Sequence, residues 1–214
     1  MGSDNNCIVT LEDLEALYGV VANPSMVKEE DYIHAVYRPF IERAFFVVLA
    51  TAGPGGLDAS PRGDKAGFVH IEDSRTLLLP DRRGNNRIDS LRNIVKDPRV
   101  ALLFLLPGVG ETLRVNGTAQ ITIQPDLLSR FIVNNQTPKT VIRITVNAVY
   151  FQCSRSIIRS GLWDDDASHI DRATLPTPGQ ILKVLSRSEI NGDVYDSALP
   201  GRLAKIPCIN PSLL

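Results

Sequence analysis

Arginines are concentrated in two polar segments that each follow a run of apolar residues. The first is Asp58–Lys65 (DASPRGDK) and the second, called the basic turn below, is Asp81–Arg87 (DRRGNNR). A guanidinium group offers a fork of donors that matches phosphate oxygens, and nearby glycines let backbone amides approach an anion. A helix is expected to begin near Asn86, and its N-terminus would add a favourable dipole. These residues predict a phosphate site.

The same arginines could instead be solvated surface charges. Arg82, Arg83 and Arg87 stand close in sequence to Asp81 and Asp89, and exposed ion pairs of this kind are common. The presence of two such segments in one chain favours the anion site. Neither segment contains a GxxxxGK[ST] or GxGxxG pattern, so nucleoside triphosphate and dinucleotide folds are disfavoured.

The composition is that of an ordinary globular protein. Of 214 residues, 43% are hydrophobic and 22% charged, and 23 Lys and Arg face 24 Asp and Glu, a formal net charge of −1. This balance gives no reason to expect a nucleic-acid or membrane partner, and no apolar run approaches the ~20 residues of a membrane-spanning helix. We therefore expect a cytoplasmic protein. Three dispersed cysteines and three dispersed histidines favour neither disulfides nor a bound metal.

Short apolar strands must position these polar segments. Strands are expected at residues 45–51, 67–71, 76–79, 100–106, 112–123 and 140–152. Polar turns between them predict antiparallel hairpins, and Gly117 suggests a bulge. A helical pattern runs from Ile88 to Asp97-Pro98, and a shorter helix is expected near 127–133. The pattern is typical of a mainly β architecture with peripheral helices, an α+β protein in which the strands form a barrel.

The chain is expected to divide into one domain with two extensions. Residues 1–25 predict an N-terminal helical appendage, and residues 26–164 predict the barrel domain, opened by a helix that ends at Arg38-Pro39. The composition then shifts toward Asp, Ser, Thr and Pro. Residues 165–214 are therefore interpreted as a C-terminal arm packed on the same domain.

The order of strand, Arg-bearing segment, hairpin, basic turn and helix leads into the run Asp97–Phe104 (DPRVALLF). This arrangement resembles the pyridoxamine 5′-phosphate oxidase-like flavoproteins of the split β-barrel fold. The segments VKEEDYIHAVYRPFI, SPRGD, LLLPDRRGNNRIDSLRNI, YFQC and RSGLWD extend the resemblance over most of residues 26–164. They are similar to an uncharacterised FMN-binding subgroup.

The resemblance implies FMN bound at the interface of a two-fold homodimer. Residues implied to contact it are Ser60, Arg62, Leu79, Pro80, Asp81, Arg82, Arg83, Asn86, Arg87, Phe151, Arg159 and Trp163. Arg62 would grip the phosphate, with a further contribution from one or more of the three arginines in the basic turn. Trp163 could border the ring or anchor the arm. Long strands with apolar residues on both faces independently favour a dimer.

Other matched positions leave alternatives open. Ser90 and Asn93 match helix positions facing the phosphate, although both could face solvent. His70 is interpreted as a satisfied histidine of the barrel wall. No residue is a firm general base.

Two motifs of the true oxidases are absent, an Arg-x-Val-Leu-Leu-Lys segment and a C-terminal Trp-plus-Arg motif. Oxidation of vitamin B6 is therefore disfavoured. We expect an FMN-binding flavoprotein that acts as an oxidoreductase on a small substrate or reductant. The alternatives are a flavin-storing or flavin-sensing module without turnover, and a barrel that binds a deazaflavin or heme.

Overall fold

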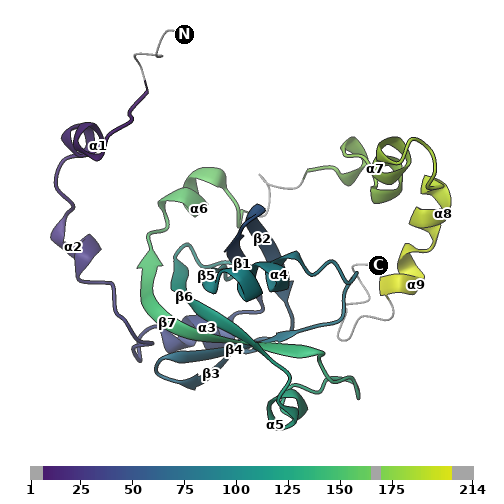
Figure 1. Ribbon diagram of the computed structural model, residues 1–214. Coiled ribbons are helices and arrows are strands. Elements are labelled where there is room, and N and C mark those ends of the chain that lie inside the picture. The colour runs from purple at the N-terminus through teal and green to yellow at the C-terminus, as the bar shows by residue number, and fades with distance from the viewer. Residues whose placement is uncertain (1–6, 165–169, 204–214) are drawn as a thin grey trace.

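The computed structural model describes residues 7–164 and 170–203 (Figure 1), and its strands form one antiparallel sheet. The strands are β1 (Phe46–Gly53), β2 (Gly56–Gly63), β3 (His70–Asp73), β4 (Thr76–Asp81), β5 (Arg99–Phe104), β6 (Thr112–Thr122) and β7 (Thr140–Gln152). Their order is β2-β1-β5-β6-β7-β4-β3, with β2 and β3 at the two edges. The sheet and its few helices make the α+β split-barrel fold expected from the sequence.

The described residues also form several short helices. They are α1 (Leu11–Tyr18), α2 (Asn23–Met26), α3 (Arg38–Arg43), α4 (Asp89–Lys96), α5 (Pro125–Ser129), α6 (Arg155–Ser160), α7 (Pro178–Leu185), α8 (Gly192–Ser197) and α9 (Leu199–Leu203), with a 3₁₀ turn at Arg172–Thr174. In the described ranges, no helix is long and apolar enough to span a bilayer.

The core lies on the inner face of the curved sheet. Side chains such as Leu49, Phe104, Leu113 and Ile144 are fully buried there, and burying side chains of this size drives folding. Most outward positions of β6 and β7 are polar or half-exposed, for example Arg114 and Thr145. Val141 of β7 is an exception, because it is buried in a second, smaller apolar cluster with Leu78 and Leu127. Apolar residues on both faces, as expected, therefore occur at the start of β7, where Val141 and Ile142 are both buried, but not along most of these strands. The dimer stays a prediction.

One segment expected to be a loop is largely a strand. Residues 58–63 lie in β2, where Asp58 pairs with Thr51 and Arg62 with Val47 of β1. The strand was not predicted because its sequence is polar. An edge strand with an exposed face does not need to alternate apolar and polar residues. Pro61 fits here, since edge strands tolerate a residue without a backbone N–H. Arg62 therefore stands on a paired strand rather than a loop.

The helix expected to open the barrel domain and to end at Arg38-Pro39 is also wrong. The α2 helix stops at Met26, and Arg38-Pro39 opens α3 because proline is well accommodated in the first helical turn. Between them, irregular backbone buries Ile33 and Tyr37. The Tyr37 hydroxyl donates to the carbonyl oxygen of Lys28, and burial raises the pKa of Tyr37. The shorter predicted helix near 127–133 lies slightly earlier, as α5.

In the described part of the chain, neither α1 nor the helices α7–α9 share the core. Every residue of α1 is exposed, and in α7–α9 the buried positions are Gly179 and Gly192, which bring α7 and α8 into close backbone contact. Asp196 accepts hydrogen bonds from the Thr177 hydroxyl and the Gly179 amide, which fixes this helical hairpin. Packing of the arm on the barrel remains a prediction, and residues 165–169 and 204–214 lie outside the described part.

The turn between α4 and β5 holds a carboxylate whose titration is a test of the fold. Side-chain hydrogen bonds from Arg99, supported by its backbone amide, lower the pKa of Asp97 from 3.8 to about 2. A lowered folded-state pKa stabilises the fold above pH 3.8, and this contribution is lost as the pH falls through 2. Carboxyl NMR titration should place Asp97 near 2 in the wild type, whereas a value near 3.8 would contradict the pairing. Asp97→Asn should remove this part of the acid dependence of stability.

Candidate functional site

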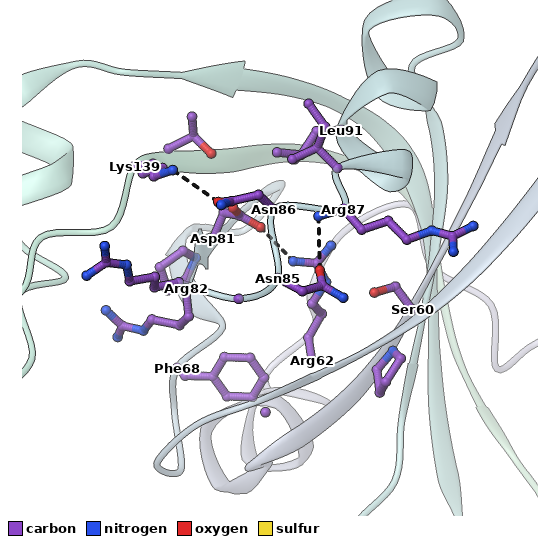
Figure 2. A pocket seen from close by; sticks show the side chains of 17 residues that line it. Ser60, Arg62, Phe68, Asp81, Arg82, Asn85, Asn86, Arg87, Leu91 and Lys139 are labelled. Carbon is purple, nitrogen blue, oxygen red and sulfur yellow. Dashed lines mark hydrogen bonds and ion pairs between the residues drawn. The ribbon is translucent and has the colours of Figure 1, made fainter. Parts of the chain in front are cut away.

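A pocket of about 450 Å³ opens where the polar segments of the sequence meet (Figure 2). It is lined by Ser60–Gly63 of β2, Phe68, Pro80–Ile88, Leu91 of α4 and Lys139-Thr140 at the start of β7. The lining thus combines cations with apolar side chains.

Side-chain contacts bring the two edges of the sheet together at this pocket. The β2 strand is one edge, and β4 lies next to the opposite edge. Arg62 of β2 reaches across to Asp81 at the end of β4, with Nη1 2.6 Å from Oδ1 (Figure 2). In the β4–β7 register, Asp81 lies opposite Thr140, which completes the wall. The ion pair therefore joins strands that are not neighbours in the sheet.

A second half-buried ion pair fixes the basic turn. The Nε of Arg82 donates to Asp64 at 2.6 Å, and its Nη1 donates to the carbonyl oxygen of Phe131. These contacts tie the turn to the segment after β2 and to the segment after α5. Arg82 is therefore occupied by structural contacts. Arg87, by contrast, is 80% exposed and pairs with the adjacent Asp89.

Two buried polar atoms of the pocket walls have no hydrogen-bond partner. They are Arg62 Nε and Thr140 Oγ1, and they are the two such side-chain atoms in the residues that the structure describes. An unsatisfied buried donor costs about 1–3 kcal/mol. An acceptor group inside the pocket would remove the cost at Nε, because Asp81 occupies only Nη1 of the same guanidinium.

The pocket carries an excess of positive charge. Five cations line it, Arg62, Arg82, Arg83, Arg87 and Lys139, and three carboxylates pair with them, Asp64, Asp81 and Asp89. Two positive charges remain, which is close to the charge carried by a phosphate monoester at neutral pH, about −1.5 to −2. The site thus matches a phosphate dianion in charge.

Residues 33–153 match the family model described as pyridoxamine 5′-phosphate oxidase. The chain belongs to this family. The match covers all seven strands but excludes α1, α2 and the helices after β7. No curated protein matches the chain.

Solved structures similar to this family member include HupZ of Group A Streptococcus, an F420 reductase and an FMN-binding protein from Syntrophomonas wolfei. HupZ is 19% identical with a TM-score of 0.45, covering 57% of this chain and 95% of its own. The F420 reductase is 22% identical with a TM-score of 0.38, covering 54% and 94%. The FMN-binding protein is 11% identical with a TM-score of 0.42, covering 66% and 95%.

Most of the residues that the sequence singled out lie together in this family member. Those that line the pocket are Ser60, Arg62, Pro80, Asp81, Arg82, Arg83, Asn86 and Arg87. Leu79 instead points into the core and is 1% exposed. Asn86 does not begin a helix, because α4 starts at Asp89 and Asn86 has a left-handed backbone with φ 60°. A helix dipole at Asn86 is therefore wrong.

Phe151, Arg159 and Trp163 lie at the other end of β7. Phe151 follows Thr140 by eleven positions along β7, roughly 35 Å of strand at the usual rise per residue. The Phe151 ring lies under Lys28, with Nζ 4.9 Å from its centroid. Trp163 is half-buried, and its Nε1 donates to the carbonyl oxygen of Val109 at 2.9 Å. Within one chain, these residues cannot reach a ligand in the pocket.

Trp163 is therefore expected to act as a packing anchor within its own chain. Trp163→Phe keeps an aromatic ring but leaves the Val109 carbonyl without its donor, which should lower stability by about 1 kcal/mol. Thermal unfolding measures this loss. An unchanged melting temperature together with an altered spectrum of bound flavin would contradict the anchoring role.

Ser90 and Asn93 connect α4 to the first hairpin and do not line the pocket. The buried Ser90 hydroxyl donates to Asp58, and the Asn93 amide donates to Thr51 Oγ1. Asn93 packs so closely on Gly53 that a Cβ there would lie 2.2 Å from Asn93 Oδ1. Ser90 and Asn93 were expected to face either the phosphate or the solvent. Both instead form structural hydrogen bonds within the chain.

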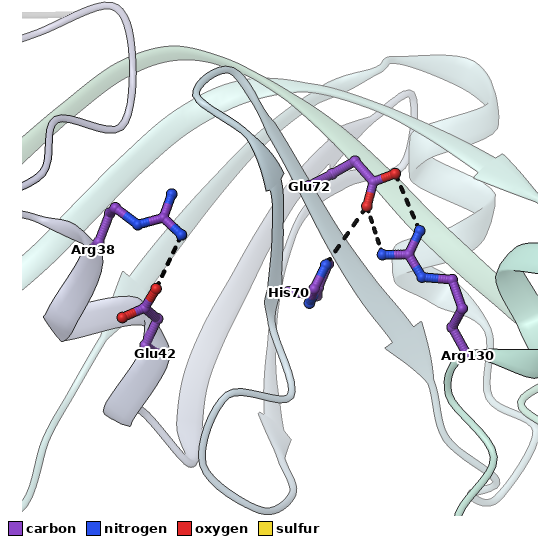
Figure 3. Close-up of polar contacts among 5 residues, drawn as sticks. All are labelled: Arg38, Glu42, His70, Glu72 and Arg130. Atoms are coloured by element: carbon purple, nitrogen blue, oxygen red, sulfur yellow. Dashed lines mark hydrogen bonds and ion pairs between the residues drawn. The ribbon is translucent and has the colours of Figure 1, made fainter.

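His70 is more exposed than the interpretation of a barrel-wall histidine implies. Figure 3 shows its Nε2 approaching Glu72, at 3.6 Å, and Glu72 receiving two hydrogen bonds from Arg130. These bonds from Arg130 lower the pKa of Glu72. Arg38 and Glu42 form a separate ion pair on α3 (Figure 3). His70 therefore belongs to a surface cluster outside the pocket.

Sequence reasoning missed two polar residues of the pocket, Lys139 and Thr140. Their position beside the basic turn depends on the pairing of β4 with β7, which strand periodicity does not reveal. Phe68, Ile88 and Leu91 were also missed as lining residues. Among described residues, no group of His, Cys, Asp and Glu is arranged to hold a metal.

Proposed function

We propose that the pocket binds the phosphate end of FMN and that the protein is an FMN-dependent oxidoreductase acting on a small substrate. The observation that carries this proposal is the buried Arg62 Nε without an acceptor, in a pocket with two excess positive charges. Membership of the pyridoxamine 5′-phosphate oxidase family supports a flavin as the ligand.

The residues present fit FMN in both of its chemical parts. Arg62 and Arg83 offer guanidinium donors to a phosphate, and Arg83 forms no ion pair within the described residues. Phe68, Ile88 and Leu91 supply apolar surface in the same pocket, which suits a flat aromatic ring. The arrangement therefore favours a ligand that is anionic at one end and aromatic at the other.

The chain's own contribution is to bind and orient. FMN, when bound, supplies reversible hydride or electron transfer. Asp81 holds one end of Arg62, and Asp64 holds Arg82, so these carboxylates position the arginines. Both carboxylates are already paired with arginines, so neither is free to act as an acid or a base. The substrate would therefore react with the cofactor without help from a carboxylate of the pocket.

A visible absorbance spectrum of the purified protein tests the proposal. Flavin bands that bleach on addition of a nicotinamide reductant and return with turnover support an oxidoreductase. Bound flavin whose bands do not bleach with any reductant would indicate a storage or sensing module instead. A deazaflavin or heme spectrum would contradict FMN and favour the other ligands of the barrel.

We also propose that the protein acts as a homodimer. Phe151 and Arg159 lie too far from the pocket to serve it in the same chain, whereas a two-fold partner could present them to it. Sedimentation is expected to give twice the chain mass of 23.5 kDa. A stable monomer that still binds FMN would contradict this.

A further inference from the structure

Lys139 and Thr140 form a wall of the pocket that comes from a distant part of the sequence. Thr140 opens β7 opposite Asp81, the last residue of β4. Pro138 just before them is buried, which fixes the direction in which the chain enters the strand. The two residues therefore have a defined place against the basic turn.

Thr140 faces the pocket with an unsatisfied hydroxyl. Its Oγ1 is buried and has no partner among the described residues. Arg62 Nε, the other such atom, belongs to the opposite wall. A hydroxyl can donate to a phosphate oxygen, as Nε can, so each of the two walls holds a donor that still needs an acceptor.

Lys139 is a pocket cation that no carboxylate neutralises within the described residues. Its Nζ donates to the side-chain oxygen of Asn86 at 3.2 Å (Figure 2), a neutral partner. An ammonium group has three donors, so this contact leaves others for a ligand. Arg62, Arg82 and Arg87, by contrast, each have an aspartate.

The contact with Lys139 also holds the basic turn. Asn86 has φ 60°, a left-handed conformation that non-glycine residues adopt at a cost. The hydrogen bond from Lys139 joins this strained residue to the start of β7. Lys139 thus lies beside the turn that carries Arg83, the other cation without an ion pair in the described pocket lining.

We propose that Lys139 and Thr140 bind the phosphate of the flavin and set the preference of the pocket for FMN over riboflavin. This inference rests on the proposed function. It assigns the excess positive charge to Lys139 and Arg83, and it gives the hydroxyl of Thr140 a ligand.

The test compares FMN and riboflavin titrations of the full-length protein. Lys139→Gln is expected to weaken FMN by roughly tenfold or more, because a charge-assisted contact is lost, and to leave riboflavin within about twofold. Thr140→Val should weaken FMN by roughly threefold to tenfold. Lys139→Arg, which keeps the charge, should stay close to the wild type. Lys96→Gln on α4 outside the pocket is the matched control and should change neither affinity.

The outcomes separate the inference from the proposed function. Wild-type FMN binding that Lys139→Gln leaves unchanged, or weakens equally for riboflavin, overturns the inference alone. A wild type that binds neither flavin overturns the proposed function and the inference with it. Melting temperatures of all variants identify any loss that comes from unfolding, and Lys139→Gln is at an exposed position that should fold normally.

Discussion

Replacement of Arg62 by alanine is expected to weaken FMN binding by at least tenfold. Arg62 is the arginine that combines an anchored end, Nη1 on Asp81, with a buried and unpartnered Nε in the pocket wall. Hydrogen bonds to charged groups contribute about 1.5–3 kcal/mol, and about 1.4 kcal/mol is one decade in affinity. Flavin fluorescence titration measures the change.

Two further variants make the Arg62 result specific. Arg62→Lys keeps the charge but removes Nε, so it should recover only part of the affinity, since lysine lacks the guanidinium fork. Arg99→Ala removes an exposed arginine that is also paired with an aspartate but lies outside the pocket, and it should bind FMN normally. Unchanged FMN affinity in a folded Arg62→Ala variant would remove Arg62 from the site.

The second large effect is expected on stability, at Gly117. The register of β6 and β7 shifts between Asn116 and Gly117, and a Cβ at Gly117 would lie 2.2 Å from the backbone oxygen of Thr145. Backbone in a paired strand cannot move away cheaply, so Gly117→Ala should destabilise by about 3 kcal/mol. The melting temperature should fall by roughly 6–12 °C.

A second glycine provides the control for this steric argument. Gly55, in the turn between β1 and β2, has open space around the position that a Cβ would take, with no atom within 4 Å, and its φ is not positive. Gly55→Ala should therefore leave thermal unfolding unchanged. Equal melting temperatures for Gly117→Ala and the wild type would show that the bulge relaxes without cost.

Apolar alternation made much of the sheet predictable. The bounds 140–152 of β7 were recovered from periodicity alone, and the isolated glycine at 117 correctly indicated the bulge. Residues 58–63 were not recognisable as β2, because an exposed edge strand carries little hydrophobic signal. The apolar residues near Ile33 and Tyr37 have the spacing of a helical face, which led to the wrong prediction of a helix. They are buried, but the backbone that carries them is irregular.

The candidate site was predictable only where its residues are local in sequence. The basic turn and Arg62 were identified by composition, since guanidinium groups beside glycines indicate anion binding. Lys139 and Thr140 gain their position from the pairing of β4 with β7, a long-range contact. Likewise, the roles of Asp64 and Asp81 as partners of Arg82 and Arg62 depend on how the sheet curves.

A comparison of FMN and riboflavin affinities in the wild-type protein tests the central claim most directly. The two flavins share the ring and the ribityl chain and differ in the phosphate. If the pocket between β2, the basic turn and β7 binds that phosphate, calorimetry should show FMN at least tenfold tighter than riboflavin. This difference should shrink as salt is added, since exposed cations such as Arg83 are screened. Equal affinities for the two flavins would contradict the account.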